Sequence, residues 1–150
     1  MTAIRSNIKD IEKAILIAFD NDKEIYKFYD PLTTVSSTEE ILSDIIKKFK
    51  DYGRGMKYYI VYEKKEMIGY FVSIKEMLIS FAINIVYRTK EILNTFFKEI
   101  INKIGLNMYC FLYGKNIRAI KWLIKNGMEI ELEFMYKNIN ITKLKIKLCQ

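Results

Sequence analysis

The sequence has no histidine, only two cysteines and one proline in 150 residues. Without histidine the chain lacks the commonest metal ligand and the side chain that most often exchanges protons near neutral pH. Cys110 and Cys149 lie in apolar or strand-like surroundings and do not have the close spacing of a zinc site. We therefore expect no metal, and a reducing, cytoplasmic environment.

The sequence also lacks a long apolar run, a signal peptide, a repeat and a linker rich in Pro, Gly or Ser. Its longest apolar stretch runs from Met77 to Tyr87 and is interrupted by Ser80 and Asn84. A membrane-spanning helix needs about 20 apolar residues. We expect a soluble protein that forms one domain over residues 1–150 and has no membrane partner.

Charge is the most prominent compositional feature, with a net charge of +7 and a pI of about 9.2. Such a charge favours nucleic acid, an anionic membrane surface or a small polyanionic ligand. The lysines are scattered over many predicted elements, as on an ordinary solvated surface. Nucleic acid binding therefore rests on net charge alone, and we do not expect it.

The first half of the chain predicts a short strand and two helices. Residues 2–5 read as the strand, and apolar residues from Ile8 to Phe19 recur at helical spacing. This helix should fade before Asp30 and Pro31, because the residue before a proline disfavours the α region. A second helix begins at Thr38 and ends at Gly53.

From residue 57 the pattern changes to strands and helices in alternation. Two strands joined by a charged turn predict a hairpin, and the next strand is too continuously apolar for a solvent face, so it belongs in the middle of a sheet. The predicted elements are strands at 58–63, 67–75, 77–86 and 108–113, and helices at 89–104 and 116–125.

The last two predicted strands carry opposite charges in alternation with apolar residues. Glu129, Glu131 and Glu133 alternate in the first, and Lys143, Lys145 and Lys147 in the second. A turn centred on Asn138 would place Glu133 opposite Lys143, Glu131 opposite Lys145 and Glu129 opposite Lys147. Such exposed pairs are structural and predict no ligand.

A family resemblance rests on four residues at a fixed spacing. Asn116, Ala119, Lys125 and Gly127, followed by Met128 where phenylalanine is usual, resemble the late motif of the GNAT N-acetyltransferases. The hairpin, buried strand and amphipathic helix upstream stand in the GNAT order. The resemblance implies an α/β fold, a mixed central sheet of about six to seven strands flanked by about four helices.

The resemblance also implies acetyl-CoA, the acetyl thioester of coenzyme A, as cofactor. Its pantetheine would pair with the strand, and its pyrophosphate would bind where a glycine-rich loop opens the following helix. Here Arg88 keeps its place but both glycines are absent, and Glu91 would repel a pyrophosphate. Some GNAT-like proteins, including phage-encoded ones, look similarly glycine-poor. The implied cofactor residues are Phe81, Ala82, Ile83, Arg88, Thr89, Lys90, Glu91, Ile92, Leu93 and Asn116.

Catalytic residues are harder to assign. Leu123 stands where the family often has a tyrosine acid, and Glu63 and Glu76, the carboxylates nearest the central strand in sequence, read as solvated strand ends. The resemblance places the wall that would bind the acceptor substrate at an aromatic cluster between the first two helices. Such residues more commonly pack against the helices, and Trp122 likewise more commonly packs in a core. The cluster comprises Tyr26, Phe28 and Tyr29.

Two functional interpretations remain from the sequence. The first is an acyl-CoA-dependent N-acetyltransferase acting on a small-molecule or protein amine by direct transfer, with proximity and backbone polarisation supplying most of the rate. The second is a GNAT-like binding or structural module without catalysis, such as a phage particle component, that associates with a protein partner or with copies of itself. The missing glycines and Leu123 favour the second interpretation.

Overall fold

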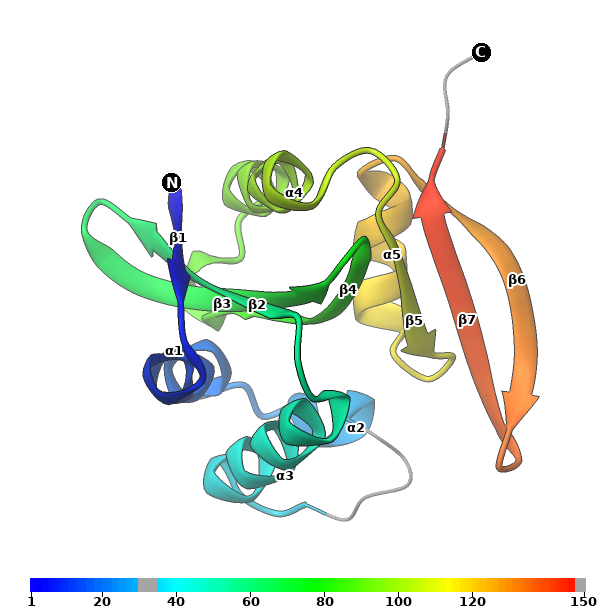
Figure 1. The fold of residues 1–150 in the computed structure, drawn as a ribbon, viewed down its shortest axis with the longest axis horizontal. Helices are drawn as coiled ribbons and strands as arrows, with labels where there is room; N and C mark the ends of the chain where they lie inside the picture. Colours follow the sequence, from blue (N-terminus) through cyan, green and yellow to red (C-terminus); the bar gives the residue numbers. More distant parts are fainter. Residues whose placement is uncertain (30–34, 148–150) are drawn as a thin grey trace.

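The computed structural model describes residues 1–29 and 35–147 as a seven-stranded mixed sheet between two layers of helices (Figure 1). The strands lie in the order β1-β2-β3-β4-β5-β7-β6, and β4 and β5 are the parallel pair. This arrangement confirms the predicted α/β fold. The elements are β1 Thr2–Ser6, α1 Ile8–Phe19, α2 Ile25–Phe28, α3 Thr38–Tyr52, β2 Met56–Glu63, β3 Glu66–Ile74, β4 Met77–Ile83, the 3₁₀ turn η1 Ile85–Tyr87, α4 Lys90–Ile104, β5 Tyr109–Tyr113, α5 Ile117–Lys125, β6 Met128–Tyr136 and β7 Ile139–Ile146.

The first helix covers the apolar positions that the sequence indicates, Ile8 to Phe19. Its N-terminus is capped by the side chain of Asn7, and it ends at Phe19, well before Asp30. Asn21 has a left-handed backbone, with φ of 59°, which stops the helix and turns the chain toward the one-turn helix α2. The break matters because it carries Asp22 into the interior. Asp30 and Pro31 lie outside the described residues.

Two apolar cores lie on opposite faces of the sheet. Figure 1 shows α4 and α5 over one face and α1, α2 and α3 over the other. Alternate residues of β3 point to the two sides: Phe71 packs in the core beneath α4, whereas Tyr70 and Val72 pack with α1 and α3. All three side chains are fully buried. This central position explains the continuous apolar character of β3.

No helix in residues 1–29 and 35–147 has both the length and the apolar character needed to cross a lipid bilayer.

The predicted register of the last hairpin is wrong, although the hairpin itself forms. Its turn has two residues, Lys137 and Asn138, both with positive φ, so Tyr136 pairs with Ile139. A bulge between Ile130 and Leu132 then shifts the pairing again. The resulting ion pairs join Lys143 to Glu131 at 3.1 Å and Lys145 to Glu129 at 3.9 Å.

The central strand β4 is also shorter than predicted. It ends at Ile83, and Asn84 begins the 3₁₀ turn by accepting a hydrogen bond at Oδ1 from the Val86 amide. The Asn84 Nδ2 donates to the carbonyl of Ile17 at the end of α1. β4 lies mid-sheet as predicted, but several of its side chains are only partly buried, because the sheet opens on its β5 side.

Candidate functional site

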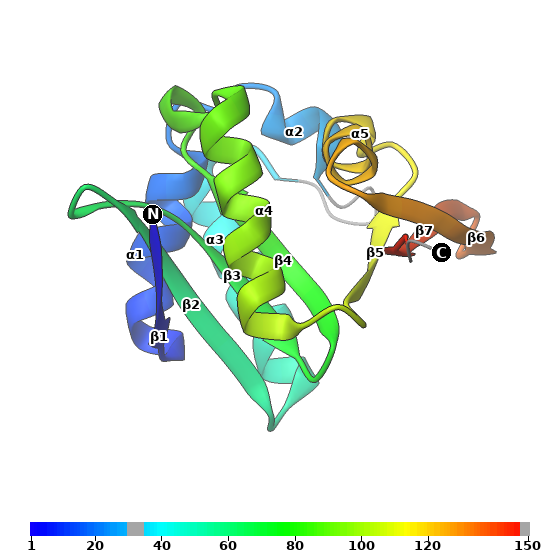
Figure 2. The ribbon, with the colours of Figure 1, turned by 90° about the horizontal axis from the view of Figure 1, so that it is seen from above.

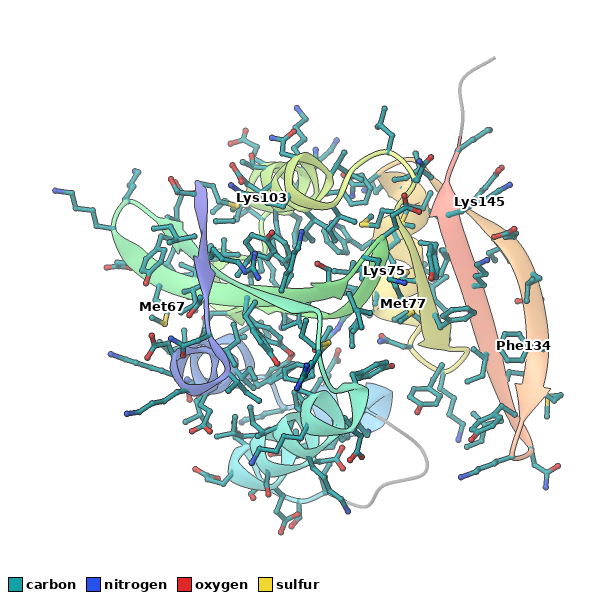
Figure 3. The ribbon with its side chains drawn as sticks, in the orientation of Figure 1. Met67, Lys75, Met77, Lys103, Phe134 and Lys145 are labelled. Carbon is teal, nitrogen blue, oxygen red and sulfur yellow. The ribbon has the colours of Figure 1, made fainter. Side chains whose placement is uncertain are left out.

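The parallel strands β4 and β5 pair at one position only. Met77, labelled in Figure 3, is opposite Tyr109, and beyond this point the strands diverge (Figure 2). A cavity of about 430 Å³ lies along this opening, and its lining includes Phe81, Ala82 and Ile83 of β4. Among the described strands none pairs with this edge of β4 after Met77. The edge therefore offers backbone polar groups to a ligand.

Two local features shape the β4 wall of the cavity. Val72 of β3 is opposite Ser80, and Ser73 is opposite Leu78, so Ile79 is an extra residue that bulges the strand. Further along, Gly69 lies opposite Ile83, and a Cβ atom there would lie 2.2 Å from the carbonyl oxygen of Ala82. The absence of a side chain at Gly69 allows β3 and β4 to approach closely beside the cavity.

A buried carboxylate joins two arginines at one part of the cavity; we call Asp22, Arg88 and Arg118 the Asp22 cluster. Asp22 accepts from Arg88 at 2.8 Å and from two nitrogens of Arg118 at 3.1 and 2.9 Å. Both arginines line the cavity. The three side chains come from the α1–α2 break, the turn before α4 and the first turn of α5. The cluster therefore fixes three distant segments around one carboxylate.

The Asp22 cluster joins two cations to one buried carboxylate. Burial raises the pKa of Asp22, but the hydrogen bonds and charges of Arg118 and Arg88 outweigh it and hold that pKa below its usual value. Burial in turn lowers the pKa of Arg88, against the opposing effect of Asp22. Glu24 lies 3.8 Å from Arg118, yet its side chain is 60% exposed and is screened by water. Two guanidinium groups that line the cavity thus share one buried carboxylate.

Arg88 lies where the sequence places it, but its side chain turns inward. Its Nε donates to the carbonyl of Ile83 at 2.9 Å, and its Nη2 donates to Asp22. Within the described chain these two bonds use two of the five N–H groups of Arg88. The others are available to an anion in the cavity.

The remaining residues assigned to the cofactor turn form an ordinary capped helix start. Thr89 caps α4, because its Oγ1 accepts from the Ile92 amide and its carbonyl accepts from the Leu93 amide. Lys90 and Glu91 are exposed. Of this turn, Arg88 and Leu93 line the cavity, whereas Thr89, Lys90, Glu91 and Ile92 do not.

Asn116 lies on the opposite wall of the cavity, where it caps α5. Its Oδ1 accepts from the Ala119 amide at 3.3 Å, and both residues line the cavity. Trp122, one turn further along, lines it too, and its ring stacks on Phe96 at 5.6 Å. The indole nitrogen of Trp122 is buried and has no hydrogen-bond partner within the described residues. Packing is therefore its main contact in this structure.

Aromatic side chains form the part of the cavity that faces α3 and the last strands. Figure 2 shows β5, β7 and β6 on the far side of the opening from α3. We call this part the tyrosine wall; it comprises Tyr29, Tyr52, Tyr70, Tyr113 and Tyr136 with Phe49 and Phe111.

Two hydroxyls of the tyrosine wall, those of Tyr29 and Tyr70, have hydrogen-bond partners inside the protein. The Tyr29 hydroxyl donates to Asp44, and the Lys48 ammonium lies 2.8 Å from the same carboxylate and 5.2 Å from the centre of the Tyr29 ring. The Tyr70 and Ser80 hydroxyls are hydrogen-bonded at 2.7 Å. Burial raises the pKa of Tyr70, so its phenol stays protonated.

The structure assigns the predicted aromatic cluster only in part. Tyr29 lines the cavity, but Tyr26 does not and is 44% exposed. The side chain of Phe28, like Cys149, lies outside the described residues. Tyr29 lines the cavity and also packs against the core beside α1 and α3, and its role as an acceptor wall stays a prediction.

The carboxylates considered as bases lie away from the cavity. Glu63 is 3.5 Å from the amino group of Met1, and Glu76 is exposed in the turn before β4. Neither lines the cavity, and Leu123 is fully buried in the core. Among the described lining residues there is no Asp or Glu. The described lining therefore supplies no carboxylate that would accept a proton.

Asp22, Arg118 and Lys48 were not predicted as site residues. Arg118 falls inside the Asn116 to Gly127 motif, which was the available signal for it. Asp22 and Lys48 give no such signal, because a single charge in a helical or loop segment usually faces solvent.

Comparisons with known proteins agree on the fold. No family model and no curated protein matches the sequence. Among solved structures, the spermidine N-acetyltransferase of Vibrio cholerae, in complex with CoA and spermine, covers 95% of this chain and 92% of its own with a TM-score of 0.59 at 14% identity. An acetyltransferase of Salmonella typhimurium that modifies the N-terminal serine of a 50S ribosomal subunit protein covers 96% and 93% with a TM-score of 0.66 at 12% identity.

A third similar structure, a putative phosphinothricin N-acetyltransferase, covers 99% of both chains with a TM-score of 0.62 at 14% identity. These likenesses show that the chain has the fold of the GNAT N-acetyltransferases, from β1 to β7.

Proposed function

We propose that this chain is an acyl-CoA-dependent N-acetyltransferase, built as one domain, that transfers an acetyl group to an amine. The observation that carries the proposal is the opening between β4 and β5, where a cavity of about 430 Å³ runs beside an unpaired strand edge. The GNAT fold and a neighbour bound to CoA support it. The amine is a small molecule or a protein side chain or terminus.

The residues present fit coenzyme A in two respects. The β4 edge at Phe81–Ile83 offers backbone groups to the amides of pantetheine, and the two guanidinium groups of the Asp22 cluster suit phosphate. The first turn of α4, at 89–93, and Asn116 complete the proposed set. Glu91 opposes phosphate at that helix end, and Lys90 offsets it. When bound, coenzyme A supplies a thioester that an amine can attack.

The chain itself contributes position rather than proton transfer. The bulge at Ile79 re-aims the β4 backbone, and the tyrosine wall holds the acceptor and excludes water. Hydrogen-bond donors on the strand edge favour charge that develops on an oxygen during transfer. Direct transfer within one complex is the mechanism this arrangement supports.

A thermal-shift titration with acetyl-CoA and with desulfo-CoA tests the proposal. A ligand at 100 times its Kd stabilises the native state by about 2.7 kcal/mol, so a saturable rise in Tm is expected. Arg118→Met and Asn116→Ala should weaken the shift at least tenfold in ligand concentration, whereas Arg54→Met, which changes an exposed arginine outside the cavity lining, should not. A Tm that ignores both ligands would remove the proposal.

A second candidate function is a GNAT-like binding or structural module without catalysis, such as a phage particle component. One observation favours it: β6 exposes several large apolar side chains beyond its first residue. These are Ile130, Leu132, Phe134, Met135 and Tyr136. Light scattering at micromolar concentration separates the two functions, since a stable assembly without any response to coenzyme A would favour the module.

A further inference from the structure

The strand β6 forms one outer edge of the sheet (Figure 1), and none of the described strands pairs with its outer side. Its residues from Ile130 to Tyr136 are all exposed, and the large apolar ones among them keep exposed fractions of 39 to 61%. An edge strand presents a row of backbone N–H and C=O groups, so a long apolar edge is a template for another strand.

The two edges of the sheet differ in how they are protected. The edge strand β1 has only five residues, and its Arg5 is exposed. Short strands and positive side chains are common means of blocking edge pairing. β6 has nine residues, and its part from Leu132 to Tyr136 contains neither proline nor lysine. Of the two edges, β6 is therefore the one that is open to a further strand.

The part of β6 that follows the bulge is regular and is centred on Phe134. Its five residues pair one-to-one with β7, up to the two-residue turn of the hairpin. Alternate side chains of a strand point to opposite faces of the sheet. One face therefore carries Leu132, Phe134 and Tyr136, and the other carries Glu133 and Met135.

We propose that β6 pairs antiparallel with β6 of a second copy of this chain, about a twofold axis that passes through the sheet at Phe134. In this register Phe134 lies opposite Phe134 of the second copy, and Leu132 lies opposite its Tyr136. Glu133 lies opposite Met135, so the glutamate faces no other carboxylate. Aromatic and apolar side chains in directly opposite positions are favourable cross-strand pairs.

Charge and overlap select this register over its neighbours. A twofold axis perpendicular to the sheet keeps each face on its own side, so the axis has to pass through a residue position. A centre at Leu132 places Glu131 opposite Glu133, and a centre at Glu133 places two carboxylates face to face. Like charges in directly opposite positions destabilise a strand pair. A centre at Met135 avoids this repulsion but leaves Leu132 opposite Asn138 of the turn.

The pairing is closed, because both copies use the same strand and no second β6 edge is left over. It joins the two sheets into one and places a β1 strand at each end. Tyr136 also lines the cavity, so Leu132 of the second copy adjoins the tyrosine wall. The pairing concerns the sheet edge alone and is compatible with either proposed function.

Sedimentation equilibrium at micromolar concentrations should give a mass of twice 17.9 kDa. Phe134→Lys brings two ammonium groups together at the axis and should raise the dissociation constant about tenfold or more. Leu106→Lys, which changes a 68% exposed leucine before β5, should leave that constant unchanged. Association also stabilises the native chain, so the unfolding of β6 variants is measured at concentrations where the chain is monomeric.

Single cysteines test the register without a change of charge. Directly opposite Cβ atoms lie about 4.5 to 5.5 Å apart, close to the spacing of about 3.5 to 4.5 Å in a disulfide. Phe134→Cys should therefore form a disulfide-linked dimer under mild oxidation. Leu132→Cys should not, because its two copies lie about 13 Å apart along the strand, but a mixture of Leu132→Cys and Tyr136→Cys should form the mixed dimer. Cys149 is replaced by serine in this series, and Cys110 is buried.

The outcomes decide the pairing separately from the chemistry. A mass of 17.9 kDa at every concentration overturns the pairing, as does a mass that grows beyond two copies. A dimer whose dissociation constant ignores Phe134→Lys forms elsewhere, and linkage of Leu132→Cys to itself in place of Phe134→Cys overturns the register. A dimer that ignores acetyl-CoA overturns the acetyltransferase and leaves the pairing standing.

Discussion

The two halves of the sheet differ in how completely they are covered. β2, β3 and β4 lie between α1 and α3 on one face and α4 on the other, and Val61, Phe71 and Val72 are fully buried. In β6 only Met128 is buried, and the following residues are exposed or partly exposed. The cavity lies where these halves separate. The well-covered strands β2, β3 and β4, which we call the platform, therefore adjoin a hairpin whose apolar side chains remain exposed to a ligand or a protein partner.

Truncation of one phenylalanine in each half should give the largest difference in unfolding free energy between the two halves. Phe71, fully buried and stacked on Tyr59 at 4.7 Å, should lose about 3 to 5 kcal/mol of unfolding free energy as Phe71→Ala. Phe134, labelled in Figure 3, is 39% exposed, so Phe134→Ala should cost less than about 1.5 kcal/mol. Urea denaturation measures both, and equal losses would show that the hairpin is packed as tightly as the platform.

The Asp22 cluster spans the junction between the two halves, so Asp22→Asn should lower the free energy of unfolding. Breaking a buried ion pair typically costs about 3 to 5 kcal/mol, because the remaining charges are left unpaired. The pKa of Asp22 is lowered from 3.8 in the folded state, so its contribution is fully present above that value and is lost as pH falls below it.

The stability difference between the native chain and Asp22→Asn should therefore be constant from pH 5 to 8 and shrink below about pH 4. Urea titrations at several pH values measure it. A difference that does not shrink in acid would mean that Asp22 stabilises through packing and not through its charge.

Substituting one glycine in each half compares the two halves again, with a smaller expected loss of unfolding free energy. Gly69→Ala places a Cβ atom against the backbone of Ala82 and Ile83, which cannot move aside cheaply, and we expect a loss of about 1 to 3 kcal/mol. In Gly114→Ala the nearest atom is the Cβ of Asn140 at 3.1 Å, in the hairpin half.

We expect Gly114→Ala to lower the free energy of unfolding by less than half as much as Gly69→Ala, because the less covered hairpin can shift. Thermal denaturation gives the two values, and a binding titration with coenzyme A shows whether the distortion at Gly69 reaches the cavity. Similar costs at both positions would argue against a more yielding hairpin half.

Periodicity predicts the order of the elements well and the contacts between them poorly. The alternation of β3 and the stripe of α4 specify strand and helix, because burial of one face dominates their local energetics. The hairpin register escapes prediction, because one two-residue turn and one bulge, at Glu131, decide it. A single extra residue reverses which side chains face each other.

The candidate site is harder to predict from the sequence than the fold is. Arg88 and Asn116 are found through a motif, yet the partner of Arg88 is Asp22, 66 residues away along the chain. Nothing in the local pattern distinguishes Asp22 from a solvated aspartate. The break after Phe19 that delivers it inward depends on the left-handed Asn21, a choice that an apolar pattern does not encode.

The Asp22 cluster also constrains how this chain can diverge. Loss of Asp22 alone would leave two neighbouring guanidinium groups without their shared counter-ion, and loss of either arginine would leave the carboxylate underneutralised. The three positions should therefore covary among homologues. Descendants of this chain are thus more apt to vary their tyrosine wall than the charged cluster beside it.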